Sequence, residues 1–357
     1  MPLLAEARGR YKAIAQIQGA PEAARMGFVC LSEQGDCLRA LGQLDAAADA
    51  YEESIGGLAR LGDERGVAVG HIQLGTVRRN QGRYSEALAS YAQARDYFTR
   101  LDDPGSIATI WHQTGIAYQQ AGEPEAAEDA YRQSLAINMR LGKVAGQAST
   151  LSQLGILYDL GFGHLEETAK FFSQAADKYA GLPDQVREGK TRSNLSEALR
   201  KLRRLDEARQ QICRAIDCFA QLGYTTELWR SWSILANIEM DAGNPAAAAE
   251  AKGKAIACYL AYRRDGGENH DAPGRIALAV TQSLLAGDPA QAALLLQQLA
   301  AEPDAAWLLP FIYALQAIVA GGRDRSLAAA PELHYTMAAE ILLLIETLEK
   351  AGNQRLE

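Results

Sequence analysis

The stretch LGTVRRNQGRYSEALASYAQARDYFTRL, residues 74–101, contains the pattern that decides the fold. Apolar and small residues recur in it at spacings of three and four, as they do along one face of an α-helix. Gly82 interrupts this pattern, and a helix commonly ends next to a glycine that adopts a left-handed conformation. The sequence around this stretch therefore predicts two helices, over about 67–80 and 85–101, with Ser85 capping the second.

The same pattern recurs along the chain with a period of 40 residues. Three landmarks keep this period, one tyrosine and two glycines: Tyr11, Tyr51, Tyr91 and Tyr131; Gly35, Gly75, Gly115 and Gly155; Gly42, Gly82 and Gly122. A fixed period of this length is the sequence signature of a repeat array. The chain is therefore predicted to be all-α, a right-handed α-solenoid of antiparallel helix pairs.

The unit resembles the tetratricopeptide repeat. The residues that carry the resemblance are Leu74, Gly75, Gly82, Ala87, Tyr91 and Ala94. The usual unit has about 34 residues, and the longer unit found here is similar to the repeats of kinesin light chains and of bacterial signal-transduction ATPases with numerous domains (the STAND class). The resemblance implies a tetratricopeptide superhelix that serves as a protein-binding scaffold and not as an enzyme.

The chain divides into three parts by how well it keeps the period. Residues 1–24 match the second half of a unit, which predicts a half repeat or an N-terminal capping helix, and which favours a fragment of a longer polypeptide. About six 40-residue units follow over 25–265, the last two of them degenerate. The polar, glycine-rich run 263–270 ends the period, and 266–357 are predicted to form a helical C-terminal cap.

Composition excludes several classes of function. The 357 residues include 36 Lys and Arg against 44 Asp and Glu, a net charge of −8 that argues against nucleic-acid binding. No window approaches the ~18 apolar residues of a membrane span. The five cysteines form no C-x-x-C pair, which favours reduced thiols in the cytoplasm. No catalytic or metal-binding motif is found, so the sequence predicts neither an enzyme nor a cofactor or metal site.

A solenoid presents a concave surface, here predicted from the first helix of each unit. An amide recurs at one position of four successive units, as Gln73, Gln113, Gln153 and Asn194. Amides donate and accept hydrogen bonds, so this ladder could hold the backbone of an extended peptide; glutamine is equally a good exposed helix former, which leaves both interpretations open. The other residues of the predicted peptide-binding face are Thr76, Arg79, His112, Ile116 and Ile156.

The fifth unit concentrates positive charge in an otherwise acidic chain. Lys190, Arg200 and Lys201 are predicted to dock an acidic stretch of a partner, since complementary charge speeds association. A solvated basic face is the alternative. The sequence thus favours a scaffold that recognises an extended partner segment. The alternative function is a C-terminal sensor arm excised from a larger bacterial signalling ATPase or effector.

The C-terminal region contains an unusually apolar helix. Residues 341–345 (ILLLI) are apolar all round, which predicts burial on several sides. Two explanations are open, a cap that closes the solenoid or a dimer surface.

Overall fold

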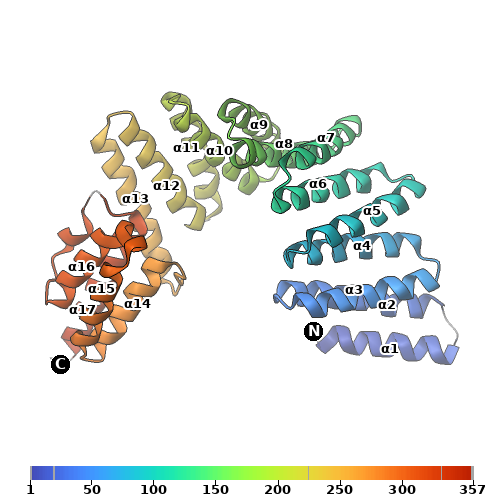
Figure 1. The fold of residues 1–357 in the computed structure, drawn as a ribbon, viewed down its shortest axis with the longest axis horizontal. Coiled ribbons are helices and arrows are strands. Elements are labelled where there is room, and N and C mark those ends of the chain that lie inside the picture. The colour runs from blue at the N-terminus through green and yellow to red at the C-terminus, as the bar shows by residue number, and fades with distance from the viewer. Residues whose placement is uncertain (1, 19–20, 224, 331, 355–357) are drawn as a thin grey trace. The chain divides into compact units, whose positions relative to one another are not determined.

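The computed structural model describes residues 2–18, 21–223, 225–330 and 332–354. Within these residues all regular structure is helical and no strand occurs, which confirms the predicted all-α class (Figure 1). The chain forms two compact units, unit 1 (Met1–Pro183) and unit 2 (Asp184–Glu357). The division falls inside the predicted array of 25–265, and the predicted boundary at residue 24 falls inside a helix that begins at Pro21.

Unit 1 consists of successive antiparallel helix pairs, as Figure 1 shows for α2 to α7. Its helices are α1 (Pro2–Gln18), α2 (Pro21–Ala40), α3 (Leu44–Arg60), α4 (Glu64–Asn80), α5 (Tyr84–Arg100), α6 (Pro104–Ala121), α7 (Pro124–Arg140), α8 (Val144–Leu157), the π-helical turn η1 (Tyr158–Phe162) and α9 (Leu165–Tyr179). The even-numbered helices from α2 to α8 open each pair, and the odd-numbered helices from α3 to α9 close it.

Each pair is held by a glycine of the first helix that packs against an aromatic ring of the second. A Cβ atom at Gly75 would lie 2.6 Å from the ring of Tyr91, and one at Gly115 would lie 2.6 Å from the ring of Tyr131. Both rings are fully buried. Because no larger residue fits at this contact, the glycine and the aromatic residue must recur together, which explains why both keep the 40-residue period. The same contact joins Gly35 to Tyr51 and Gly155 to Phe172.

In the turn between α4 and α5, the structure confirms the predicted conformation of the glycine but not the predicted N-cap residue. Gly82 has φ +76°, in the left-handed region that glycine adopts without strain. The second helix begins at Tyr84, earlier than predicted, so Arg83 occupies the N-cap position and Ser85 lies inside the helix. The Ser85 prediction was wrong because the Arg83 N–H donates to the carbonyl of Arg78 at 2.8 Å, which shortens the turn.

Unit 2 contains two further pairs and a C-terminal helical region. Its helices are α10 (Gln185–Lys201), α11 (Leu205–Leu222), α12 (Thr225–Asp241), α13 (Pro245–Arg264), α14 (Ala272–Leu285), α15 (Pro289–Ala301), the 3-10 turn η2 (Pro303–Leu308), α16 (Leu309–Val319), the 3-10 turn η3 (Arg325–Ala328) and α17 (Tyr335–Gln354). In the pair α10–α11, Ser196 and Ile212 replace the signature glycine and aromatic residue, and both are fully buried. A different glycine, Gly189, packs against the ring of Phe219 there.

The apolar run of the C-terminal region is largely buried within unit 2. Ile341, Leu344 and Ile345 of α17 are buried, and Leu342 and Leu343 are half-buried, which confirms that this helix is covered on several sides. The helix packs against α13, α14 and α16 of the same unit. The apolar run 341–345 thus contributes to the core of unit 2. Its roles as a cap or as a dimer surface both stay predictions.

A buried ion pair fastens α17 to α13. The carboxylate of Glu340, which is 2% exposed, lies 2.9 Å from Nε of Arg263. The hydroxyl of Tyr259 donates to the same carboxylate at 2.6 Å. Because this charge is removed from water, it depends on these partners.

A buried histidine is expected to make the stability of unit 1 depend on pH. His71 of α4 stacks on Tyr97 with ring centroids 6.1 Å apart, and its Nδ1 is buried without a hydrogen-bond partner among the described residues. Burial lowers the pKa of this imidazole below its usual value. The unfolded chain therefore binds a proton more readily, and stability should fall as the pH drops from 7.5 through the unfolded pKa of ~6.5.

The replacement His71→Leu tests this expectation. Leucine fills the equivalent position in two other repeats, as Leu31 and Leu151. The melting temperature of the variant should differ less between pH 7.5 and pH 5.5 than that of the parent chain. Some dependence should remain, since burial also lowers the pKa of His334 in unit 2. Equal pH dependence in the parent and the variant would contradict the assignment.

Candidate functional site

The first helices of the pairs line the inner side of unit 1. Helix α2 contacts α4, α4 contacts α6 and α6 contacts α8, whereas the second helices of neighbouring pairs contact each other less. Helices that approach one another more closely lie on the inside of a curved stack, which is the side that repeat proteins commonly use for binding. The inner face of unit 1 is therefore formed by α2, α4, α6 and α8.

The predicted amides lie at matching places on this face. Gln73 on α4, Gln113 on α6 and Gln153 on α8 are all half-buried. Within the described residues the side-chain amides of Gln73 and Gln153 form no hydrogen bond, whereas the oxygen of Gln113 accepts one from Nη1 of Arg79 at 2.9 Å. Two of the three amides thus lack a hydrogen-bond partner among the described residues, and Arg79 donates to the third.

The fourth amide of the predicted ladder belongs to the other unit. Asn194 is half-buried on α10 of unit 2, and no hydrogen bond of its side chain occurs in the described part of the chain. Like the glutamines of unit 1, it lies on the first helix of its pair.

Hydroxyl groups of the packed tyrosines reach the inner helices, a feature that the sequence analysis missed. The Tyr131 hydroxyl donates to Oε1 of Gln119 at 2.9 Å, and the Tyr51 hydroxyl donates to Asp36 at 2.8 Å. Burial raises the pKa of both phenols, which therefore stay protonated. A sequence signal existed, since three successive repeats have tyrosine where phenylalanine would fill the same space.

Some of the other inner-face residues predicted from the sequence form hydrogen bonds within the chain. The Thr76 hydroxyl donates to the carbonyl of Ile72 at 2.9 Å and lies 3.3 Å from the Tyr91 hydroxyl. Nδ1 of His112 lies 3.2 Å from the Thr150 hydroxyl, which links α6 to α8. Such contacts fix these side chains in place. Two half-buried isoleucines on the same face, Ile116 and Ile156, keep part of their apolar surface accessible.

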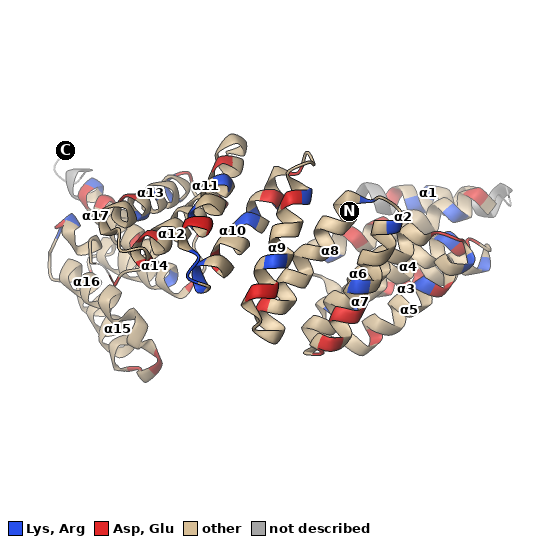
Figure 2. Cartoon of the chain, turned by 90° about the horizontal axis from the view of Figure 1, so that it is seen from above, with Lys and Arg blue, Asp and Glu red and all other residues tan. Residues whose placement is uncertain are grey.

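The basic residues of the fifth unit have carboxylate neighbours. Nζ of Lys190 lies 3.1 Å from Glu227, and Nη1 of Arg200 lies 2.7 Å from Asp241. Lys201 also interacts with another group of the chain. Figure 2 shows the same mixture more widely, with acidic and basic residues interspersed along the helices. An acidic partner would therefore have to replace carboxylates that unit 2 already supplies.

The described residues contain neither a membrane-spanning helix nor a metal-binding cluster. No helix there is long and apolar enough to cross a membrane. No group of three or more histidine, cysteine or acidic side chains is arranged to hold a metal ion there.

Comparison with known proteins identifies the repeat. A model of the tetratricopeptide repeat family matches residues 66–140, the stretch that contains most of the helix pair α4–α5 and the whole of the pair α6–α7. No curated protein matches the sequence. The resemblance drawn from Leu74, Gly75 and Tyr91 is thus confirmed.

Solved structures show the same architecture. BtubC (BKLC) from P. vanneervenii has 19% identity and a TM-score of 0.56, covering 62% of this chain and 90% of its own. A signal transduction ATPase with numerous domains, which has a tetratricopeptide repeat sensor and comes from Pyrococcus horikoshii, has 14% identity and a TM-score of 0.54. That match covers 98% of this chain and 52% of the ATPase. A putative kinesin light chain from Podosopora anserina is also similar, with 16% identity over 54% of this chain and 95% of its own and a TM-score of 0.46.

At these identities the likeness concerns the fold alone. It confirms a tetratricopeptide-type α-solenoid. The repeats that the family model matches over 66–140 indicate a scaffold for protein interactions.

Proposed function

We propose that the chain binds an extended segment of a partner protein along the inner face of unit 1. The observation that carries this proposal is the pair of half-buried amides, Gln73 and Gln153, which recur at one position of their repeats and form no hydrogen bond within the described residues. Structural glutamines of a packed face would be expected to bond to their neighbours, as Gln113 and Gln119 do. Amides that remain open at regular intervals suit a repeating ligand.

An extended peptide backbone is such a ligand. It offers a donor and an acceptor at every residue, and a glutamine amide can pair with either. The accessible edges of Ile116 and Ile156 lie on the same face and supply apolar contact for one or two side chains of the peptide. Backbone pairing carries little sequence information, so these isoleucines would give the site most of its selectivity.

Unit 2 supplies a second proposed contact, for an acidic stretch of the partner. Asn194, Lys190, Arg200 and Lys201 all belong to α10. Lys190 is 52% exposed and its ion pair with Glu227 is in contact with solvent, where ion pairs contribute only about 0–1 kcal/mol. Arg200 and Asp241 are 27% and 29% exposed. Exchange of these carboxylates for those of a ligand therefore costs little. This contact should weaken as salt rises, whereas the amide contact should not.

A peptide library displayed on phage provides a defined probe for the test. Peptides selected on the full chain should lose about tenfold in affinity for the variant Gln73→Ala/Gln153→Ala, since each lost hydrogen bond costs about 0.5–1.5 kcal/mol. The matched control is Gln93→Ala/Gln133→Ala, which removes two exposed glutamines from the second helices α5 and α7. Isothermal titration calorimetry should show no change for the control. If both double variants bind like the parent chain, the amides do not contact the ligand.

A second candidate function is that of a sensor arm of a larger signalling ATPase. The observation that favours it is the match in which 98% of this chain corresponds to 52% of an ATPase with a tetratricopeptide repeat sensor. A nucleotide-binding domain encoded upstream in the same reading frame would support this function, and a stop codon in that frame would exclude it. In either function we place the chain in the cytoplasm, which agrees with its five unpaired cysteines.

A further inference from the structure

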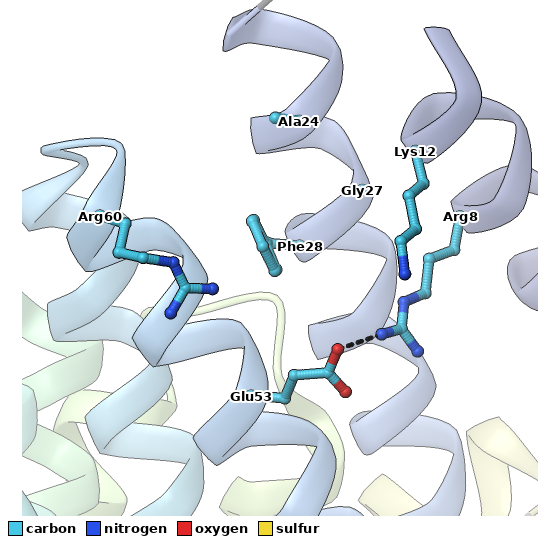
Figure 3. A pocket seen from close by; sticks show the side chains of 7 residues that line it. All are labelled: Arg8, Lys12, Ala24, Gly27, Phe28, Glu53 and Arg60. Atoms are coloured by element: carbon cyan, nitrogen blue, oxygen red, sulfur yellow. Dashed lines mark hydrogen bonds and ion pairs between the residues drawn. The ribbon is translucent and has the colours of Figure 1, made fainter. Parts of the chain in front are cut away.

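Unit 1 contains a pocket that the peptide site does not use. It has a volume of about 360 Å³ and lies between α1, α2 and α3 (Figure 3). Its residues come from α1, α3 and the first half of α2, and none of them is among the residues predicted to bind the peptide. We call this cavity the α1–α3 pocket.

The pocket exists because two residues of the first repeat are smaller than their equivalents. Gly27 forms part of the wall, whereas the next two repeats have Val67 and Ile107 at this position. Ala24 lies one helical turn before Gly27, where the next repeat has Glu64. In the following repeat Val67 is 2% exposed and fills the corresponding space.

A second difference from the later repeats, at one position of α2 and one of α3, places an aromatic ring in the pocket. Phe28 lies where the following repeats have Ala68, Ala108 and Ala148. Its ring fits because Gly57 of α3 has no side chain, and a Cβ atom there would collide with the ring. The following repeats have larger side chains at the position of Gly57, including Tyr97 and Ile137. The ring of Phe28 therefore forms an apolar surface that is particular to this repeat.

Three cations surround this ring. Arg8 and Lys12 extend from α1 on one side, and Arg60 extends from α3 on the other, with Phe28 between them (Figure 3). Glu53 is the one acidic residue among those that line the pocket, and it pairs with Arg8. The guanidinium of Arg60 lies 5.9 Å from the centre of the Phe28 ring. Within the described residues neither Lys12 nor Arg60 has a carboxylate partner, so the pocket keeps an excess of positive charge.

We propose that the α1–α3 pocket binds a small organic anion that consists of an aromatic ring and one oxyanion group, a carboxylate or a phosphate. The ring would pack on Phe28, and the oxyanion would lie between Arg60 and Lys12. Aromatic rings pair favourably with one another, and hydrogen bonds between oppositely charged groups are stronger than neutral ones. The volume lies at the lower end of the ~300–1,000 Å³ typical of small-molecule sites, which suits a ligand with a single ring.

Phenyl phosphate and benzoate are the probes that test this proposal and distinguish its two oxyanions. Calorimetric titration of the full chain should show saturable binding of at least one of them, and weaker binding of inorganic phosphate. The replacement Gly27→Val should weaken binding, because its side chain occupies part of the pocket without changing its charge. A Cβ atom at Gly27 meets only Tyr11, at an ordinary 3.8 Å, so the variant should fold. Circular dichroism checks that it does.

Charge variants give a second, independent readout. Lys12→Ala and Arg60→Ala should each weaken binding about tenfold, since a hydrogen bond to a charged group contributes at least this factor. The matched control is Arg100→Ala, which removes the equivalent of Arg60 one repeat later, where Val67 fills the space. It should leave binding unchanged. The proposal is overturned if neither probe binds, if inorganic phosphate binds as tightly as phenyl phosphate, or if Arg100→Ala weakens binding as much as Arg60→Ala.

Discussion

Replacing Tyr131 with alanine is expected to lower the free energy of unfolding by about 3–5 kcal/mol, the usual cost of truncating a buried aromatic side chain. The ring of Tyr131 is fully buried and packs against Gly115 of the preceding helix. The cavity left behind cannot close easily, because the glycine has no side chain that could move into it. Urea denaturation followed by circular dichroism measures the change.

The variant Tyr131→Phe separates the contribution of the ring from that of the hydroxyl. It keeps the packing against Gly115 and removes the hydrogen bond to Gln119. The expected loss is about 0.5–1.5 kcal/mol, the net contribution of one hydrogen bond. If Tyr131→Ala cost no more than Tyr131→Phe, the contact between glycine and ring would not hold the helix pair together.

Replacing Glu340 with alanine is expected to cost a similar amount, about 3–5 kcal/mol, because it breaks a buried ion pair and leaves one charge without its partner. The Arg263 side chain is 15% exposed and would stay largely out of water. The Tyr259 hydroxyl would lose its acceptor as well. Unit 2 should therefore unfold at lower urea concentration, with α17 released from α13.

An exposed ion pair on the same helix provides the control. Glu349 of α17 lies 3.0 Å from Arg325, and these side chains are 43% and 58% exposed. Glu349→Ala should change the unfolding free energy by no more than about 1 kcal/mol, as is usual for pairs at the surface. Equal effects of the Glu349 and Glu340 replacements would show that the Arg263 pair does not fasten α17.

The fold could be predicted from the sequence because one contact repeats in it. Gly75 and Tyr91 touch in space, and the same spacing of 16 residues separates Gly35 from Tyr51 and Gly115 from Tyr131, so the period is visible without a structure. In unit 2 the corresponding contact could not be predicted in this way. Gly189 and Phe219 make the same kind of contact at different positions, and only the structure pairs them.

The hydrogen bonds and ion pairs of the site residues could not be predicted, because they depend on the distances between helices of neighbouring repeats. The sequence places Arg79 and Gln113 on one face, and the hydrogen bond between them depends on how closely α4 and α6 approach. Lys190 and Glu227 likewise lie on different helices, and their ion pair appears only once α10 and α12 are packed. The α1–α3 pocket did have a sequence signal, since Gly27 departs from Val67 and Ile107 at the same repeat position.

Photo-crosslinking tests most directly whether the inner face of unit 1 is the binding surface. Benzoylphenylalanine is introduced at position 153 on the first helix α8 in one variant, and at position 133 on the second helix α7 in another. Gln153 is half-buried and Gln133 is exposed, so greater accessibility cannot explain crosslinking from position 153. A peptide selected on the parent chain is predicted to crosslink from position 153 and not from position 133. Crosslinking from position 133 alone would contradict the account and would place the ligand on the outer helices.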